Sequence, residues 1–372
     1  MGDYYTLLGV PRLINASGTL TSLGGSRMRP SAARAMADAA NCFVDLDQLH
    51  RKAGEYVARL LGVEAACITA GAAAGLTQAA AACMVGSDPL WRSRLPGLVP
   101  KNEIVIQCCH RNPFERSLKM TGAQLVQVGD AIRTMPFDME GAINERTAAV
   151  VHFLQSDMLE ASLQLNNVIS IAHHFKIPVI VDAAAELPPK KNLWELVQKG
   201  ADLVIFSGGK DICGPQASGL MVGRHDLIEA AIVQAAPHEH AIARPMKASK
   251  ETVVGLISAL EEYLGEDEAV RFETWELNFQ RLKTQLEKIP GLVIKRYQAS
   301  QPRIQPAIIP RLELRLEGYP ELSMIDLSNK LRNGNPPIIV DTKSEAICLN
   351  LHTLDSEELD IVINRFREII QR

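Results

Sequence analysis

The sequence predicts an α/β protein with a mostly parallel sheet that is buried on both faces, followed by a smaller α+β unit. Two observations carry this prediction. Between residues 64 and 222, short runs of continuous apolar residues alternate with helical patterns, as in a sheet covered by helices on both sides. After about residue 245, long amphipathic helices replace that alternation. The 372 residues, 47% hydrophobic and 22% charged, suit a globular chain of two domains.

The first part of the chain contains the signals of seven strands. They are expected at residues 64–69, 103–108, 124–128, 148–154, 179–182, 203–206 and 220–222. Helices are expected after Pro30, over residues 47–61, in the Ala-rich segment after residue 69, and over 166–175 and 193–199. Gly62 follows the second of these helices, where a glycine can adopt the left-handed cap.

In the last part of the chain, the predicted strands are separated mainly by long amphipathic helices. Helices are expected over 250–264, 266–288 and 324–331, with strands at 292–296, 312–316 and 346–351. A final helix starts near residue 356, because Asp355 and Glu358 have the spacing of a capping box. We therefore expect an N-terminal segment (1–45) that packs with the small domain, a large domain (46–248) and a small α+β C-terminal domain (249–372).

Composition and charge exclude several classes of protein. The net charge of −4 disfavours a broad nucleic-acid surface. The N-terminus lacks a basic patch followed by an apolar run, and polar residues interrupt the apolar segment 65–85, so we expect neither a signal peptide nor a membrane span. The seven cysteines form no CxxC pair, which favours reduced thiols in a cytoplasmic protein. No His/Cys/Asp cluster has metal-ligand spacing.

Asp182 ends the apolar run 177–182 and precedes three alanines. Ligands of doubly wound sheets bind at the carboxyl ends of strands, where this carboxylate is expected to lie. A buried carboxylate needs a partner, and a protonated ring nitrogen is one such partner. A cap for the following turn is an equally good interpretation of Asp182 alone.

Lys210 follows the strand 203–206 through Ser207, Gly208 and Gly209. The two glycines let the backbone approach a ligand closely, and burial there would lower the pKa of the amine and make it a nucleophile. Ser207 is placed to donate to a phosphate oxygen. Gly-Gly-Lys is a common string, so an ordinary solvated lysine is the simpler interpretation of Lys210 alone.

Small residues follow the first predicted strand, in the segment Thr69-Ala-Gly-Ala-Ala-Ala-Gly75. At the start of a helix, the free backbone N–H groups of Gly71, Ala72 and Ala73 could bind an anion with help from the helix dipole. Tight packing of the helix on the sheet would select the same small residues. Neither a P-loop nor a dinucleotide fingerprint is present.

His110 follows the predicted strand 103–108. At a strand end its imidazole could stack on a ring and assist proton transfer. A buried structural histidine is an equally good interpretation of this position.

Together these residues meet the requirements of pyridoxal 5'-phosphate (PLP), which needs a lysine for a Schiff base, a carboxylate at the pyridinium nitrogen, a phosphate site and a flat group on the ring. In combination they resemble fold-type I PLP enzymes of the selenocysteine synthase-like branch, which includes seryl-tRNA selenium transferase and D-glucosaminate-6-phosphate ammonia-lyase. The resemblance covers nearly the whole chain, in the segments 14–25, 43–47, 69–75, 180–186, 206–216 and 244–250.

The resemblance implies a fold and a set of roles. The fold is that of fold-type I PLP-dependent transferases, with a sheet of the seven-stranded type and helices on both faces. Lys210 would be the Schiff-base lysine, Asp182 the pyridinium partner and His110 the stacking group. Gly71, Ala72 and Ala73 would bind the phosphate with Ser207. Arg244 and Lys247 would hold an anionic substrate.

Three features depart from the selenium transferase pattern. The chain starts almost directly at the PLP-domain motif, without the tRNA-binding region that the resemblance would include. The transferase motif His-Thr-Asn-Leu-Gly-Arg appears as Leu20-Thr-Ser-Leu-Gly-Gly25, and Arg27 could replace its arginine. Lys247 stands where the transferase has a second arginine, and lysine lacks the bidentate fork. These departures favour a small anionic substrate over selenocysteine synthesis.

The predicted activity is β-elimination from a small anionic amino acid or amino-sugar acid, with Lys210 as general base for the α-proton. Racemisation and a selenium-transferase-like transfer use the same initial chemistry and remain alternatives. A catalytically silent regulatory subunit of the same fold is the non-enzyme alternative, against which Lys210 and Asp182 argue. We expect a homodimer or higher homo-oligomer, because PLP sites of this fold type usually lie at a subunit interface, and neither a nucleic-acid nor a membrane partner.

Overall fold

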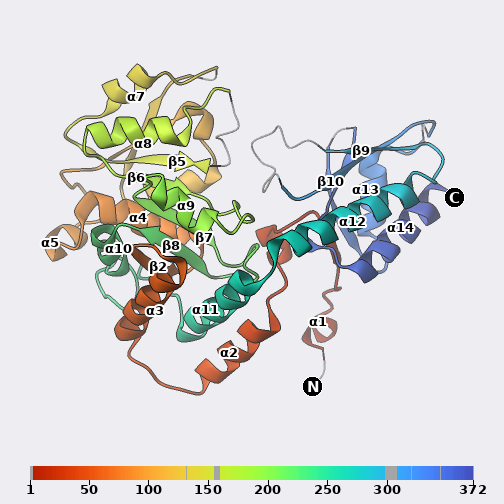
Figure 1. Ribbon diagram of the computed structural model, residues 1–372, viewed down its shortest axis with the longest axis horizontal. Coiled ribbons are helices and arrows are strands. Elements are labelled where there is room, and N and C mark those ends of the chain that lie inside the picture. Colours follow the sequence, from red (N-terminus) through yellow and green to blue (C-terminus); the bar gives the residue numbers. More distant parts are fainter. Residues whose placement is uncertain are drawn as a thin grey trace. The chain divides into compact units, whose positions relative to one another are not determined.

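The computed structural model describes residues 3–130, 132–154, 160–297, 308–319, 321–343 and 345–371. The described chain divides into two units (Figure 1). The larger unit contains residues 28–265. The smaller unit contains residues 3–27, 266–297 and the described residues from 308 onwards.

The larger unit is built on a seven-stranded sheet, as the sequence predicts. Its strand order is β2-β8-β7-β6-β5-β3-β4. Strand β8 runs antiparallel to β2 and β7, whereas the other paired neighbours are parallel. The strands are β2 (Ala65–Thr69), β3 (Glu103–Gln107), β4 (Gln124–Val128), β5 (Thr147–Phe153), β6 (Val179–Asp182), β7 (Leu203–Ser207) and β8 (Gly219–Gly223).

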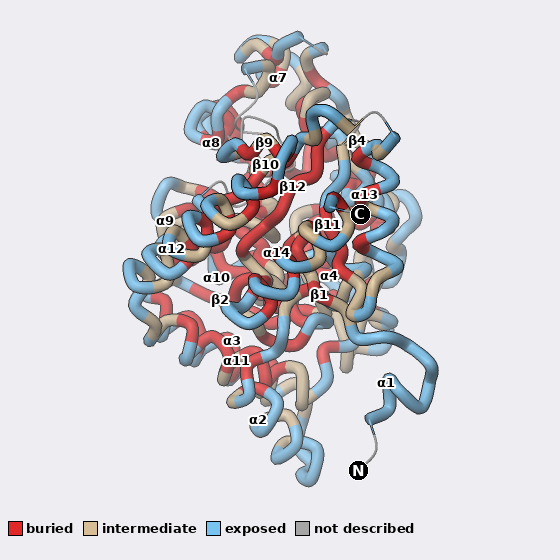
Figure 2. The backbone as a smooth tube through the Cα atoms, turned by 90° about the vertical axis from the view of Figure 1, so that its right-hand side faces the viewer, coloured by how far each residue is buried: buried red, intermediate tan, exposed pale blue. Residues whose placement is uncertain are grey.

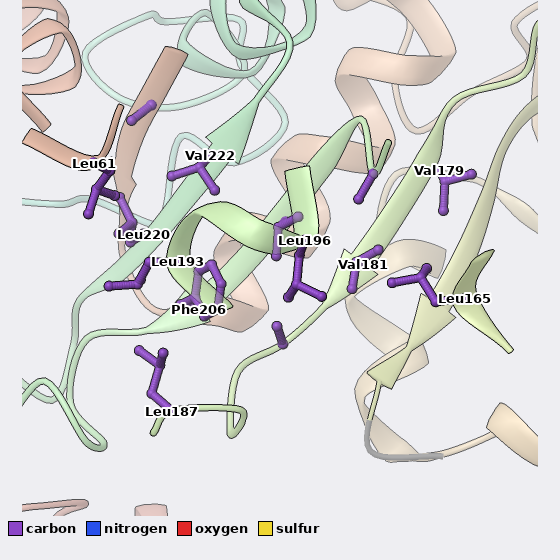
Figure 3. Close-up of a cluster of buried hydrophobic side chains, with 14 of the residues drawn as sticks. Leu61, Leu165, Val179, Val181, Leu187, Leu193, Leu196, Phe206, Leu220 and Val222 are labelled. Atoms are coloured by element: carbon purple, nitrogen blue, oxygen red, sulfur yellow. The ribbon is translucent and has the colours of Figure 1, made fainter. Parts of the chain in front are cut away.

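Both faces of this sheet are buried along β2, β5, β6 and β7, which is why these strands are largely apolar. The edge strand β4 differs, because Gln124 and Gln127 are exposed. Along β7, Val204 and Phe206 join the core on one face, while Leu203 and Ile205 join the core on the other. Figure 3 shows the first of these cores, where leucines of helix α9 (Asn192–Gln198) lie over Val181 and Phe206.

Five of the remaining helices of the larger unit lie where the sequence predicts helices, whereas those at Pro89–Arg92, Arg116–Lys119, Pro136–Ala142 and His225–Ile232 were not predicted. Helix α3 ends at Leu61, and Gly62 adopts the expected left-handed cap (φ 66°). The helices are α2 (Pro30–Ala40), α3 (Leu46–Leu61), α4 (Ala72–Val85), α5 (Pro89–Arg92), α6 (Arg116–Lys119), α7 (Pro136–Ala142), α8 (Leu165–His174), α10 (His225–Ile232) and α11 (Lys250–Gly265).

The smaller unit has a five-stranded sheet in the order β1-β11-β12-β10-β9. The N-terminal strand β1 pairs in parallel with β11. Figure 2 contrasts the exposed helix α1 with the buried strand β12. The elements are α1 (Tyr4–Leu7), β1 (Ile14–Ala16), α12 (Glu268–Leu286), β9 (Leu292–Arg296), β10 (Arg311–Leu316), α13 (Met324–Arg332), β11 (Ile338–Thr342), β12 (Ile347–Asn350) and α14 (Ser356–Ile370).

The division of the chain differs from the predicted boundaries at 45/46 and 248/249. Helices α2 and α11 belong to the larger unit, because they pack against each other. The Lys250 ammonium donates to the Ala39 carbonyl at 2.6 Å, and Arg29 pairs with Glu262 at 3.1 Å. The amphipathic pattern of α11 predicts a helix correctly, but it does not reveal which core that helix joins.

Among the described residues, the structure contains no helix with the length and apolar character that spanning a membrane requires. All seven cysteines are free of disulfide bonds, as the sequence predicts.

Candidate active site

The order of the strands places the predicted site residues at one edge of the large sheet. Strands β6 and β7 are neighbours, and Asp182 is in register with Ile205, two residues before the end of β7. Lys210 lies on the turn that follows β7. Because the carboxyl ends of parallel strands meet at the same edge, Asp182 and the Lys210 turn emerge side by side.

Asp182 is partly buried at the end of β6. The Ala184 amide donates a hydrogen bond to its Oδ1 atom at 2.9 Å. Burial raises the pKa of the Asp182 carboxyl, while the Ala184 hydrogen bond and the charge of Lys210 oppose this rise. The carboxylate therefore gains from a nearby cation. Its pairing with a protonated ring nitrogen stays a prediction.

Lys210 is held in a turn whose backbone closes on itself. The Cys213 amide donates to the Lys210 carbonyl at 3.0 Å, and the Gly214 amide donates to the Gly208 carbonyl at 2.8 Å. Burial lowers the pKa of the Lys210 ammonium, and the charges of Asp182 and Glu186 partly offset this. A lowered lysine pKa increases the fraction of neutral, nucleophilic amine.

The small-residue segment forms the start of helix α4, and Gly71 is its N-cap with φ 90°. Gly71 offers no side-chain cap, so the first backbone N–H groups of the helix are left for another acceptor. Gly219 of β8 lies directly against them, because a Cβ there would stand 2.6 Å from the Gly71 carbonyl carbon and 2.9 Å from the Ala72 nitrogen.

Ser207 lies close to the start of α4 because β7 pairs with β8. It is in register with Gly219, which contacts Gly71 and Ala72. Thr69 closes the loop by donating its hydroxyl to the Gly71 carbonyl at 2.9 Å. The ends of β2 and β7 and the beginning of β8 therefore form one small cradle, which a larger residue at position 219 would fill.

His110 also lies at this edge, in the short 3₁₀ turn after β3, but it is fully buried. Its Nδ1 atom accepts the Phe153 amide at 3.1 Å, so Nε2 carries the proton, 2.8 Å from the Ser162 hydroxyl oxygen. The ring meets His152 edge-on, 4.5 Å between centroids. Burial lowers the pKa of His110 to about 2. Its stacking role stays a prediction.

The three predicted anion-binding side chains have different surroundings. Arg244 is partly buried and Lys247 is exposed, and neither side chain has a hydrogen bond or ion pair within the described residues. Arg27 instead forms ion pairs with Asp355, at 2.7 Å, and Glu358, both at the start of α14. Two carboxylates therefore already pair with the two terminal nitrogens of Arg27.

Two residues that the sequence analysis did not single out lie near the lysine. Glu186, four residues beyond Asp182, is close enough to affect the pKa of Lys210. Asp211 is fully buried and accepts a hydrogen bond from Tyr263 at 2.8 Å. The acidic residue directly after the lysine was visible in the sequence, but its burial and its partner on a distant helix were not. The described residues contain no group of three metal-ligating side chains.

Comparison with known proteins gives consistent results. Residues 13–355 match the family model described as SelA: L-seryl-tRNA selenium transferase. The chain is 36% identical to a 5'-C-glycyluridine monooxygenase-decarboxylase from Streptomyces sp, over 90% of this chain and 83% of that protein. It is 32% identical to the D-glucosaminate-6-phosphate ammonia lyase of Salmonella typhimurium, over 99% and 98% of the two chains.

A solved structure of D-glucosaminate-6-phosphate ammonia-lyase superimposes with a TM-score of 0.85 and 31% identity, covering 100% of this chain and 99% of that one. A NifS-like protein superimposes with a TM-score of 0.61 at 18% identity, which supports the fold alone.

Proposed function

Because the chain belongs to the L-seryl-tRNA selenium transferase family of fold-type I PLP enzymes, we propose that it is a lyase that eliminates ammonia from a small anionic amino acid or amino-sugar acid. The observation that carries this proposal is the similarity to the ammonia lyase, which extends over nearly the full length of both chains. The fold, the fact that the chain is an enzyme, and the PLP cofactor follow from the family; the substrate and the reaction are our proposal.

The residues at the sheet edge fit the cofactor. The uncapped N-terminus of α4, with Gly219 against it, offers backbone donors to a phosphate. Asp182 is a strand-end carboxylate that would pair with a pyridinium nitrogen. Lys210 would carry the cofactor through its Nζ atom. When bound, PLP supplies an electron sink for the carbanion left by loss of the α-proton.

In this proposal Lys210 works as the base once a substrate amine has replaced it. Burial lowers the pKa of Lys210, which increases the fraction of neutral amine that can accept the α-proton at Nζ. Asp182 keeps its charge toward the ring nitrogen. The β-hydroxyl would take up a proton and leave as water. The α-nitrogen would leave with the product as an enamine, and a water molecule would hydrolyse its imine form to the keto acid and ammonia. Arg244 and Lys247 would bind the substrate carboxylate or phosphate, since both are cations without partners among the described residues.

The cofactor assignment is tested with Lys210→Ala. Purified wild-type protein should show the visible absorption of lysine-bound PLP, and the variant should lose it together with at least about 100-fold in kcat. Lys199→Ala, at an exposed position after α9, is the matched control and should behave as wild type. A visible band that survives both Lys210→Ala and borohydride reduction would refute the role of Lys210.

The reaction is tested by screening amino acids and phosphorylated amino-sugar acids for release of keto acid and ammonia, with α-proton exchange followed in D₂O. Exchange without product release would contradict elimination and indicate a racemase. The Arg244→Ala variant should raise KM for the anionic substrate, and an unchanged kcat/KM would remove Arg244 from the site.

A second candidate is oxidative decarboxylation, which the 36% identity to the monooxygenase-decarboxylase favours. It predicts that turnover consumes O₂ and releases CO₂. The lyase predicts neither, so an oxygen electrode during the same substrate screen separates the two activities.

A further inference from the structure

The turn that carries Lys210 lies on one face of helix α11. A Cβ at Gly208 would stand 2.6 Å from the Leu256 Cδ1 atom, and a Cβ at Gly214 would stand 3.1 Å from the same atom. Gly214 also lies beside Ala259. Leu256, Ala259 and Tyr263 follow one another at helical spacing, and all three are buried. The two glycines therefore allow the turn to approach the helix closely.

A buried hydrogen bond fixes the same turn at its centre. Tyr263 donates its hydroxyl to the Asp211 Oδ2 atom at 2.8 Å, and both side chains are fully buried. Asp211 is the neighbour of Lys210 in the chain. Two buried cations face the tyrosine ring, with the Arg29 Cζ atom 5.8 Å and the Lys190 Nζ atom 5.6 Å from its centroid. Cations over an aromatic face are attracted to it, so these two contacts help to fix the position of the ring.

Arg29 forms hydrogen bonds with the second half of the turn. Its backbone amide donates to the Cys213 carbonyl at 2.9 Å, and its Nε atom donates to the Ile212 carbonyl at 2.8 Å. Its Nη1 atom pairs with Glu262, the residue before Tyr263. Cys213 has a positive φ of 56°, a conformation that a non-glycine residue adopts only when its surroundings impose it.

We propose that Tyr263 and Arg29 are positioning residues that hold the turn between β7 and Gly214 and thereby aim Lys210 at the cofactor. This inference rests on the proposed role of Lys210 as the PLP-binding lysine. The hydrogen bonds within the turn, from Cys213 to Lys210 and from Gly214 to Gly208, fix its local shape. The contacts with α11 and Arg29 fix where that turn lies in the larger unit.

The test uses Tyr263→Phe, which removes one hydroxyl and keeps the ring between its two cations. The matched control is Tyr56→Phe, because the Tyr56 hydroxyl also donates to a carboxylate of α11, that of the exposed Glu261. Apoenzyme of each protein is titrated with PLP. The complex is then reduced with borohydride, and the residue that carries the reduced PLP is identified by peptide mapping. Thermal unfolding of each apoenzyme measures any general loss of stability.

Tyr263→Phe is expected to raise the Kd for PLP about tenfold, the effect of one lost hydrogen bond to a charged group. It should also move the pH midpoint of PLP attachment upwards, because burial lowers the pKa of Lys210 and a loosened turn lets water reach the amine. Tyr56→Phe should leave both quantities at their wild-type values. Wild-type Kd and pH midpoint in Tyr263→Phe, whatever its melting temperature, would overturn the proposal.

If Tyr263→Phe does not fold, Arg29→Lys tests the positioning proposal independently. It keeps the positive charge but loses the guanidinium fork that reaches Ile212, and it should weaken PLP binding in the same direction. Wild-type PLP binding by Arg29→Lys would equally overturn the proposal. Identifying the residue that carries reduced PLP in the wild-type protein separates the proposed function from the positioning role. Attachment of PLP to a residue other than Lys210 would refute the proposed function. Attachment to Lys210, with PLP binding unchanged in the variants, would refute only the positioning role.

Discussion

His110 lies in the interior of the larger unit, although its place after a strand suggested contact with a ligand. Its partners are the Phe153 amide and the Ser162 hydroxyl. Phe153 is in turn in register with Asp182, so His110 is placed one strand away from the proposed ring partner. A neutral buried imidazole of this kind can fix the strand end that carries the site.

His110 makes stability depend on pH. Its folded-state pKa, about 2, is lower than the usual value, so the unfolded state binds the proton more strongly. The stabilising contribution is therefore present above about pH 6.5 and is lost as pH falls, by up to about 1.4 kcal/mol per pH unit. His110→Gln should flatten the decrease in unfolding free energy between about pH 6.5 and 4.5, measured by urea denaturation.

The control for this measurement is His225→Gln, at an exposed position at the start of α10. Because this side chain is exposed, its replacement should change the unfolding free energy by less than about 0.5 kcal/mol. Equal slopes for His110→Gln and the wild type would show that His110 does not remain neutral in the folded protein.

At the scale of elements, a helix can approach the sheet closely only where a glycine leaves room for the strand backbone. Gly54 lies in the middle of α3, where glycine costs about 1 kcal/mol relative to alanine. A Cβ at this position would collide with the backbone carbonyl of Ala66 in β2. The close approach of α3 to β2 is therefore the physical reason for the glycine.

Gly54→Ala should lower the free energy of unfolding by about 1–3 kcal/mol, because backbone cannot move aside as a side chain can. Gly141→Ala is the matched control: Gly141 lies in α7, and a Cβ there would meet no atom within 4 Å. That variant should be neutral or slightly more stable. Chemical denaturation of both apoenzymes checks the pair, and a Gly54→Ala variant as stable as Gly141→Ala would contradict this packing.

At the scale of the whole molecule, cofactor binding and folding are linked. PLP binds the folded chain, so it should raise the free energy of unfolding by about 2.7 kcal/mol at 100 times its Kd. Melting temperature measured against PLP concentration gives this increase. Pyridoxal, which lacks the phosphate, should stabilise the protein less at equal concentration, because the N-terminus of α4 then has no anion to bind. Equal shifts with both compounds would contradict the phosphate cradle at Gly71.

Much of this architecture could be predicted from local pattern. Each predicted strand of the large sheet lies within one or two residues of an observed one, because a strand buried on both faces is a continuous apolar run. The capping box at Asp355 was predicted and is present. Strands β1 and β11 were not predicted: β1 is three residues long, and it is defined by its parallel pairing with a segment more than 300 residues away.

The sequence by itself determined the candidate site residues and their order: small residues after β2, an aspartate at the end of β6, and a lysine on the turn after β7. Local spacing is enough for this, since each of them lies at or just after the end of a strand that the apolar pattern marks. Only the tertiary structure decided that Gly219 lies against Gly71 and Ala72 at the start of α4, that Arg27 is paired with Asp355, and that Tyr263 and Arg29 contact the Lys210 turn. These contacts join residues far apart in the chain, and they depend on how helices and strands pack against one another.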